Sequence, residues 1–285
     1  MSRPPILTLP ACARAYRLKT ERGAFAVCDA RPPSAEPRAT ALLVPGFTGS
    51  KEDFNALLEP LAQAGFRVVS VDGRGQYESE GPADETAYGL DELAADVHAQ
   101  AAALGDGPVH LLGHSLGGLI TRAAVLRDAS PFRSLTIMSS GPAAVSAEQQ
   151  ARTKLLIDAL STRDKEAVWQ AMRAMDAENA ADAGTPPALD EFLHRRWIGT
   201  EAAQLIGTGR QLISEPDRVA ELAAVALPKH VVSGAVDYAW PVPLMDEMAE
   251  RLSARRTVIE GAEHSPNAER PKETAAALAA FWSRH

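Results

Sequence analysis

Residues 109–120 read Val-His-Leu-Leu-Gly-His-Ser-Leu-Gly-Gly-Leu-Ile, and this stretch decides the fold. Its first four residues suit a buried strand, and apolar side chains then recur at helical spacing, at positions 116, 119, 120 and 123. Between them lies a Gly-x-Ser-x-Gly pattern, which alone would arise by chance in about one chain of this length in ten. A serine on such a turn projects from the carboxyl edge of a parallel sheet, where these sheets bind ligands. We therefore predict that Ser115 is a nucleophile, the alternative being a helix N-cap.

Strand and helix patterns alternate on both sides of this motif. A hairpin over 13–29 precedes predicted strands at 41–44, 67–71, 109–112, 135–138, 230–233 and 257–259. Helices are predicted over 53–64, 90–104, 116–126, 243–252 and 271–282. Such alternation implies a mostly parallel sheet with helices on both faces, an α/β fold. Residues 143–214 break the pattern and look helical throughout. We therefore predict a helical cap over 143–214, inserted into a core made of 1–142 and 215–285.

Composition excludes several classes of protein. The 285 residues are 46% hydrophobic and 23% charged, which excludes a wholly disordered chain. A net charge of −8 without basic runs gives no reason to expect nucleic acid or an anionic membrane as a partner. The longest apolar run, 275–282, is far shorter than the ~20 residues that cross a bilayer. Two cysteines, Cys12 and Cys28, exclude a disulfide framework. The amino end lacks a secretory signal, so we expect a cytoplasmic protein; its oligomeric state stays open.

A base and an acid are needed beside the serine. Its hydroxyl is a weak nucleophile unless a histidine takes the proton and a carboxylate orients that histidine. His264 lies in a loop directly after the last predicted strand, at the same edge as Ser115. Asp237, in the turn after 230–233, is the predicted acid, with Glu263 as the alternative. A structural histidine and a solvated turn aspartate remain the other interpretations. The order Ser115, Asp237, His264 is nucleophile, acid and base.

Acyl transfer also needs two N–H groups aimed at the developing oxyanion. The Leu116 amide, directly after the serine at the helix start, is one candidate. The other is the Phe47 amide, in the turn Pro-Gly-Phe-Thr-Gly-Ser at 45–50. A plain glycine-rich connection between strand and helix is the alternative for that turn.

Four markers stand in order: the turn at 45–50, Asp-Gly-Arg-Gly at 72–75, Gly-His-Ser-Leu-Gly-Gly at 113–118, and Asp237 with His264. Together they resemble the α/β-hydrolase superfamily over nearly the whole chain, residues 24–282. The resemblance implies an eight-stranded, mostly parallel sheet flanked by helices, a helical cap after the sixth strand, no cofactor or metal, and ester-type hydrolysis. A serine nucleophile argues against the dehalogenase and epoxide-hydrolase branches, whose chemistry needs a carboxylate nucleophile.

Two departures from the family pattern stand near the predicted site. Pro-Gly at 45–46 replaces the usual His-Gly, and Tyr77 stands where the loop after 72 has a second glycine. Tyr77 or Gln76 either lines the pocket or only shapes this loop. Five apolar side chains have two interpretations: they line a largely apolar pocket, or they pack the cap on the sheet. They are Trp169, Met172, Phe47, Tyr238 and Trp240.

These features together predict a serine hydrolase. The expected substrate is a small, partly apolar molecule with a carboxylic ester, cleaved through an acyl-enzyme. A thioesterase, lactonase, amidase, C–C hydrolase or perhydrolase would use the same three residues. A binding protein that kept the fold without catalysis is the alternative from another class.

Overall fold

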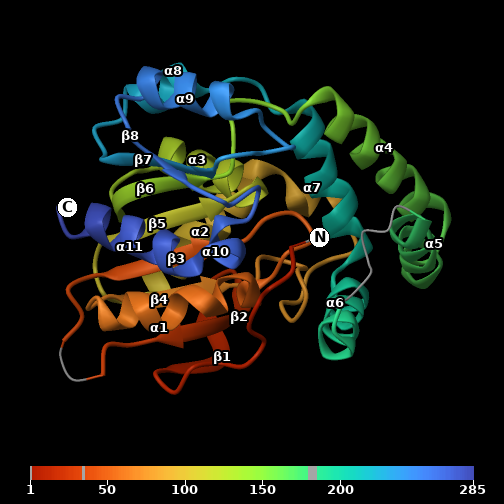
Figure 1. The fold of residues 1–285 in the computed structure, drawn as a ribbon, viewed down its shortest axis with the longest axis horizontal. Coiled ribbons are helices and arrows are strands. Elements are labelled where there is room, and N and C mark those ends of the chain that lie inside the picture. Colours follow the sequence, from red (N-terminus) through yellow and green to blue (C-terminus); the bar gives the residue numbers. More distant parts are fainter. Residues whose placement is uncertain (1, 34–35, 179–184) are drawn as a thin grey trace.

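The computed structural model describes residues 2–33, 36–178 and 185–285, and eight strands form one sheet within these ranges. They are β1 (Ala13–Thr20), β2 (Gly23–Ala30), β3 (Thr40–Val44), β4 (Arg67–Val71), β5 (Val109–His114), β6 (Phe132–Met138), β7 (Lys229–Gly234) and β8 (Arg255–Ile259). Their order across the sheet is β1-β2-β4-β3-β5-β6-β7-β8 (Figure 1). Strand β2 pairs antiparallel with β1 and β4, and every other pair is parallel. The predicted α/β fold with a mostly parallel eight-stranded sheet is confirmed.

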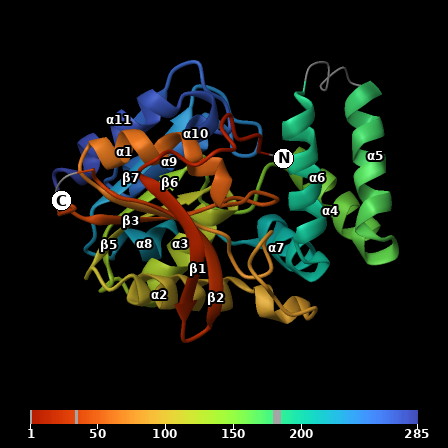
Figure 2. The same ribbon diagram turned by 90° about the horizontal axis from the view of Figure 1, so that it is seen from below.

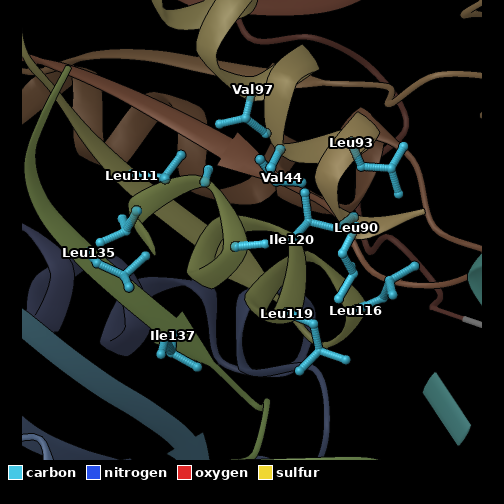
Figure 3. Packing of buried hydrophobic residues seen from close by; sticks show 14 of the residues in the cluster. Val44, Leu90, Leu93, Val97, Leu111, Leu116, Leu119, Ile120, Leu135 and Ile137 are labelled. Carbon is cyan, nitrogen blue, oxygen red and sulfur yellow. The ribbon is translucent and has the colours of Figure 1, made fainter. Parts of the chain in front are cut away.

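Helices cover both faces of the sheet. Those of the core are η1 (Lys51–Phe54), α1 (Asn55–Gln63), η2 (Glu85–Tyr88), α2 (Leu90–Leu104), α3 (Leu116–Arg127), α8 (Val219–Ala223), α9 (Val242–Arg251), α10 (Pro266–Glu269) and α11 (Pro271–Trp282). Residues of α1 and α11 form one buried apolar cluster with the sheet, and residues of α2, α3 and α9 form another. Figure 3 shows the second cluster, where side chains of β3, β5 and β6 meet those of α2 and α3. Strands β3, β4, β5 and β7 are buried at every position, as expected of strands covered on both faces.

Four of the five helices described between β6 and β7 lie in the segment predicted as a cap. They are α4 (Ala147–Thr162), α5 (Lys165–Glu178), α6 (Pro187–Gly199) and α7 (Ala202–Ser214). Apolar residues from all four form a third buried cluster. In both views α4, α5 and α6 stand to one side of the sheet, with α7 nearer to it (Figures 1 and 2). Residues 179–184 of the predicted cap lie outside the described ranges, and the domain boundaries at 143 and 214 stay a prediction.

Polar contacts join these helices to the core. The Glu201 N–H donates to the Gly75 carbonyl at 2.8 Å, and the Tyr77 N–H donates to Thr200 Oγ1 at 3.1 Å. The N-terminus lies beside α6 in both views, and the Arg196 guanidinium of α6 donates to the Ser2 carbonyl at 2.6 Å (Figures 1 and 2). The first residues of the chain therefore run between the core and the helical segment. None of the helices in the described ranges combines the length and the apolar character needed to span a membrane.

Candidate active site

Ser115 occupies a strained turn between β5 and α3. Its φ of 54° and ψ of −119° lie outside the regions that side chains normally adopt, and strain of this kind concentrates at functional sites. The flanking glycines are required because the turn is so tight. A Cβ at Gly113 would lie 2.1 Å from the Gly117 carbonyl oxygen, and a Cβ at Gly117 would lie 2.3 Å from the Val44 carbonyl oxygen. The Gly-x-Ser-x-Gly pattern is therefore explained by backbone contact at both glycines.

His264 lies within hydrogen-bond distance of this serine. It follows β8 in the loop that leads to α10, and its Nε2 lies 3.1 Å from Ser115 Oγ. Both residues are buried, and both line the cavity described below. The structure thus brings together two residues that are 149 positions apart, because β5 and β8 both end at the carboxyl edge of the sheet.

Asp237 completes the chain of hydrogen bonds. Its two carboxylate oxygens lie 3.0 and 2.9 Å from His264 Nδ1, which donates to them. Oδ1 also accepts the backbone N–H groups of Ala239 and Trp240, at 2.8 and 3.1 Å. These donors fix the carboxylate in the turn after β7. Glu263, the alternative acid, is an exposed residue. A carboxylate that accepts a hydrogen bond from the Nδ1–H group keeps the Nε2 lone pair directed at the serine.

The two predicted oxyanion donors lie on either side of the serine turn. Leu116 is the first residue of α3, and Phe47 lies in the turn after β3. Neither amide donates to a backbone acceptor in the described ranges, so both are available to a ligand. The turn that carries Phe47 passes close to the nucleophile, because a Cβ at Gly46 would lie 3.0 Å from Ser115 Cβ. A plain glycine-rich connection between strand and helix, the alternative prediction for this turn, would not explain why the turn lies so close to Ser115.

His114 is a site residue that sequence reasoning missed. Its ring lies 5.2 Å from the His264 ring, and its Nε2 donates to the His264 carbonyl at 2.8 Å. Its Nδ1 is buried without a hydrogen-bond partner among the described residues. Burial and the neighbouring His264 lower the pKa of His114 to about 4, so the ring is neutral near pH 7. His114 therefore supports the loop of the catalytic-base candidate. In the sequence, the place of His114 between Gly113 and Ser115 was the signal that could have indicated its role in the site.

A cavity of about 600 Å³ includes Ser115 and His264 in its wall. One face each of α4 and α5 supplies much of the rest, with Ser2, Arg3 and the turn at 46–48. Four of the five apolar side chains predicted to line the pocket are in this wall: Phe47, Trp169, Met172 and Tyr238. The Tyr238 ring lies 4.8 Å from the His264 ring. Substrate contact by these four residues remains a prediction.

Tyr77 and Trp240, two of the predicted pocket residues, lie outside the cavity wall, which favours the alternative interpretation given for each. The Tyr77 ring packs edge-on against Phe192 at 5.8 Å, and Lys51 Nζ lies 4.8 Å from its centre. It therefore shapes the loop after β4. Trp240 is 1% exposed, and its indole N–H donates to the Ala143 carbonyl at 2.9 Å. Trp240 therefore packs behind His264 rather than facing a ligand.

The sequence model of the alpha/beta hydrolase fold family matches residues 42–271. This chain belongs to the α/β-hydrolase fold family. Over 227 residues it is 30% identical to the pimeloyl-[acyl-carrier protein] methyl ester esterase of Aeromonas hydrophila, covering 75% of this chain and 84% of that protein. It is also 38% identical, over 105 residues, to the N-formylmaleamate deformylase of Pseudomonas putida, covering 35% of this chain and 38% of that protein.

Solved structures support the same assignment at the level of the fold. A hydrolase from Pseudomonas aeruginosa superposes with a TM-score of 0.76 at 23% identity, covering 94% of this chain and 98% of that one. The resemblance expected from the four sequence markers is confirmed. Within the described residues, no group of three or more His, Cys, Asp or Glu side chains is arranged to hold a metal ion.

Proposed function

We propose that this protein is a serine hydrolase that cleaves the carboxylic ester of a small, partly apolar molecule through an acyl-enzyme. The observation that carries the proposal is the hydrogen-bond chain from Ser115 Oγ through the His264 ring to the Asp237 carboxylate, with distances of 3.1 and 2.9 Å. Each group has the partner that its role requires, since nucleophile, base and orienting acid act as a unit.

In the proposed first step, Ser115 Oγ attacks the ester carbonyl carbon while its proton passes to His264 Nε2. Asp237 stabilises the imidazolium that forms, and the Phe47 and Leu116 amides donate to the oxyanion. Such preorganised donors contribute several kcal/mol to transition-state stabilisation. His264 then gives the proton to the departing alcohol. In the second half a water, deprotonated by His264, attacks the acyl carbon and restores Ser115.

The cavity supports a substrate of modest size with an apolar part. Its volume of about 600 Å³ lies in the range of small-molecule pockets. Leu156, Trp169 and Met172 supply apolar surface to its wall. The name of the Aeromonas hydrophila relative, a methyl ester esterase, supports an ester as the scissile bond.

The proposed function is tested by labelling with a fluorophosphonate probe and by turnover of p-nitrophenyl esters of graded chain length. We expect wild-type protein to be labelled, and Ser115→Ala to lose both the label and roughly 10⁴-fold or more of kcat. Ser130→Ala is the matched control, because Ser130 is an exposed serine in the loop between α3 and β6. Absence of labelling in folded wild type would support the binding-protein alternative. Wild-type turnover by purified Ser115→Ala would remove the mechanism.

Amide hydrolysis is the second candidate, because the Pseudomonas putida relative is named a deformylase of an N-formyl compound. Ester, amide, thioester and lactone substrates that share one acyl group separate these reactions. We expect the ester to have the highest kcat/KM. A higher kcat/KM for the amide would assign the enzyme to that second class while leaving the roles of Ser115, His264 and Asp237 unchanged.

A further inference from the structure

The wall of the cavity carries more positive than negative side chains. Four arginines line it: Arg3, Arg152, Arg163 and Arg173. Among the described lining residues the one carboxylate is Asp53, which has no exposed surface and lies 2.8 Å from the Arg196 guanidinium. The chain as a whole has a net charge of −8, so the wall is opposite in sign to the rest of the protein. A concave site lined by one sign of charge concentrates ligands of the other sign.

Two of these arginines have carboxylate partners outside the wall. Arg152 lies 2.8 Å from Glu148, and both side chains are about 70% exposed to solvent. Arg173 lies 3.1 Å from Asp190 and 5.8 Å from the centre of the Trp169 ring. An exposed ion pair such as that of Arg152 contributes about 0–1 kcal/mol, so a ligand can exchange with the Glu148 carboxylate at little cost. Both guanidinium groups therefore still add positive charge to the cavity.

Arg163 differs from the other arginines of the wall. It directly follows α4, and its guanidinium has neither a hydrogen bond nor an ion pair with any described residue. A positive charge beyond the carboxyl end of a helix is favourable, which accounts for an arginine at this position. It does not account for the place of the side chain in the cavity wall. Ala159, one turn earlier on α4, lines the same cavity, so the cavity-facing residues change from apolar to cationic between positions 159 and 163.

The wall thus combines apolar surface with positive charge along one helix. Arg152 and Arg163 are eleven positions apart, which corresponds to about 16 Å along α4. Leu156 and Ala159 lie between them in sequence and also face the cavity. A ligand that is complementary to this wall has an apolar chain and an anionic end.

We propose that the cavity binds esters whose acyl group carries a carboxylate at the end remote from the scissile bond, and that Arg163 pairs with that carboxylate. The proposal rests on the proposed ester hydrolysis at Ser115. A guanidinium and a carboxylate form two parallel charge-assisted hydrogen bonds, which are stronger than bonds between neutral groups. Arg152 and Arg173 add to the attraction through their charge. The substrate class is therefore the monoesters of dicarboxylic acids.

The test compares two homologous series: p-nitrophenyl monoesters of dicarboxylic acids, and the same esters with the free carboxylate replaced by a carboxamide. We expect wild-type kcat/KM to be higher for the carboxylate at the chain length that reaches Arg163, and added NaCl to reduce this preference. Arg163→Gln should lower the preference about tenfold, the value of one hydrogen bond to a charged group, because it lowers kcat/KM more for the carboxylate esters than for the carboxamide esters. Arg195→Gln is the control, since Arg195 lies outside the wall on α6 and its side chain is 60% exposed.

Absence of a carboxylate preference at every chain length would overturn the proposal. A preference that survives Arg163→Gln but is lost in Arg152→Gln or Arg173→Gln would show that the role assigned to Arg163 is wrong. Failure of the proposed function is a separate result: turnover of the neutral esters would then persist in Ser115→Ala. Loss of neutral-ester turnover in Ser115→Ala, without any carboxylate preference in wild type, would leave the proposed function standing and remove only this inference.

Discussion

Gln76 links the loop after β4 to the turn that carries Phe47. Its side-chain amide nitrogen donates to the Gly46 carbonyl at 3.0 Å, and its side-chain oxygen accepts the Gly73 N–H at 3.0 Å. Gln76 is buried, and these two partners fix the orientation of its amide. A rigid Gly46 carbonyl holds the peptide that presents the Phe47 N–H. We infer that Gln76 is a positioning residue for the oxyanion donor.

Replacing Gln76 by alanine is expected to lower kcat for a p-nitrophenyl ester about tenfold while KM changes little. The reason is that the oxyanion donor acts on the transition state and contributes less to ground-state binding. Steady-state kinetics on the purified variant provide the measurement, with Gln170→Ala of α5 as control because Gln170 is exposed. A wild-type kcat in Gln76→Ala would contradict the positioning role.

Residues at the ends of strands were the ones whose place could be predicted from sequence. Ser115, Asp237 and His264 each follow an apolar run, and parallel strands end at one edge, so their meeting follows from topology. For Tyr77 and Trp240 the sequence left two interpretations open, because a side chain in an irregular loop takes its direction from the backbone. Tyr77 has a φ of 44°, and no residue pattern in its loop indicates that value.

One buried ion pair connects the helical segment to the core. Arg196 of α6 lies 2.8 Å from Asp53 of η1, and the two side chains are 1% and 0% exposed. Arg196 also donates to the Ser2 carbonyl and lies 3.4 Å from Ser50 Oγ. Three parts of the chain far apart in sequence therefore meet at one guanidinium. Since both charges are removed from water, neither tolerates the loss of its partner.

Arg196→Met is expected to lower the free energy of unfolding by about 3–5 kcal/mol, because Asp53 would remain buried and unpaired. Equilibrium urea unfolding provides the measurement. The double variant Asp53→Asn with Arg196→Met should recover part of this loss, since no charge is then left without a partner. Arg195→Met is the control on the same helix, and a change within about 0.5 kcal/mol is expected there. Equal effects of Arg196→Met and Arg195→Met would contradict this account of the pair.

At the scale of the whole molecule, three neutral histidines are buried near the sheet. They are His110 of β5, His230 of β7 and His114 beside Ser115, each 2% exposed or less. Burial lowers the pKa of His110 to about 4 and that of His230 to about 3, against an ordinary value of 6.5. One ring nitrogen of each histidine lacks a hydrogen-bond partner in the described ranges. No neighbouring acceptor there therefore stabilises the charged ring that a second proton would produce.

These lowered pKa values predict a loss of stability in acid. Between pH 6.5 and about pH 4 the unfolded chain binds protons that the folded chain does not bind. The contribution of the neutral histidines to the free energy of unfolding is therefore complete above pH 6.5. It is lost as the pH falls toward 4, and the loss is roughly 3 kcal/mol for each histidine. Urea midpoints measured across this range should fall with pH.

The double variant His110→Asn with His230→Gln keeps a side-chain amide near each existing hydrogen bond, to Ser134 and Thr257. We expect its urea midpoint to vary less with pH than that of wild type. His194→Gln is the control, because the His194 side chain is 40% exposed. A double variant whose pH dependence equals that of wild type would show that other groups cause the acid sensitivity.

The residues assigned to bond cleavage and those assigned to selectivity come from different parts of the chain. Ser115, Asp237 and His264 all stand on core loops, whereas α4 and α5 supply much of the remaining cavity wall. A chimera that receives the segment from α4 to α5 from another member of the family should therefore keep its chemical step and acquire the donor's range of acyl groups. Natural divergence of substrate choice could follow the same route, without any change at the reacting atoms.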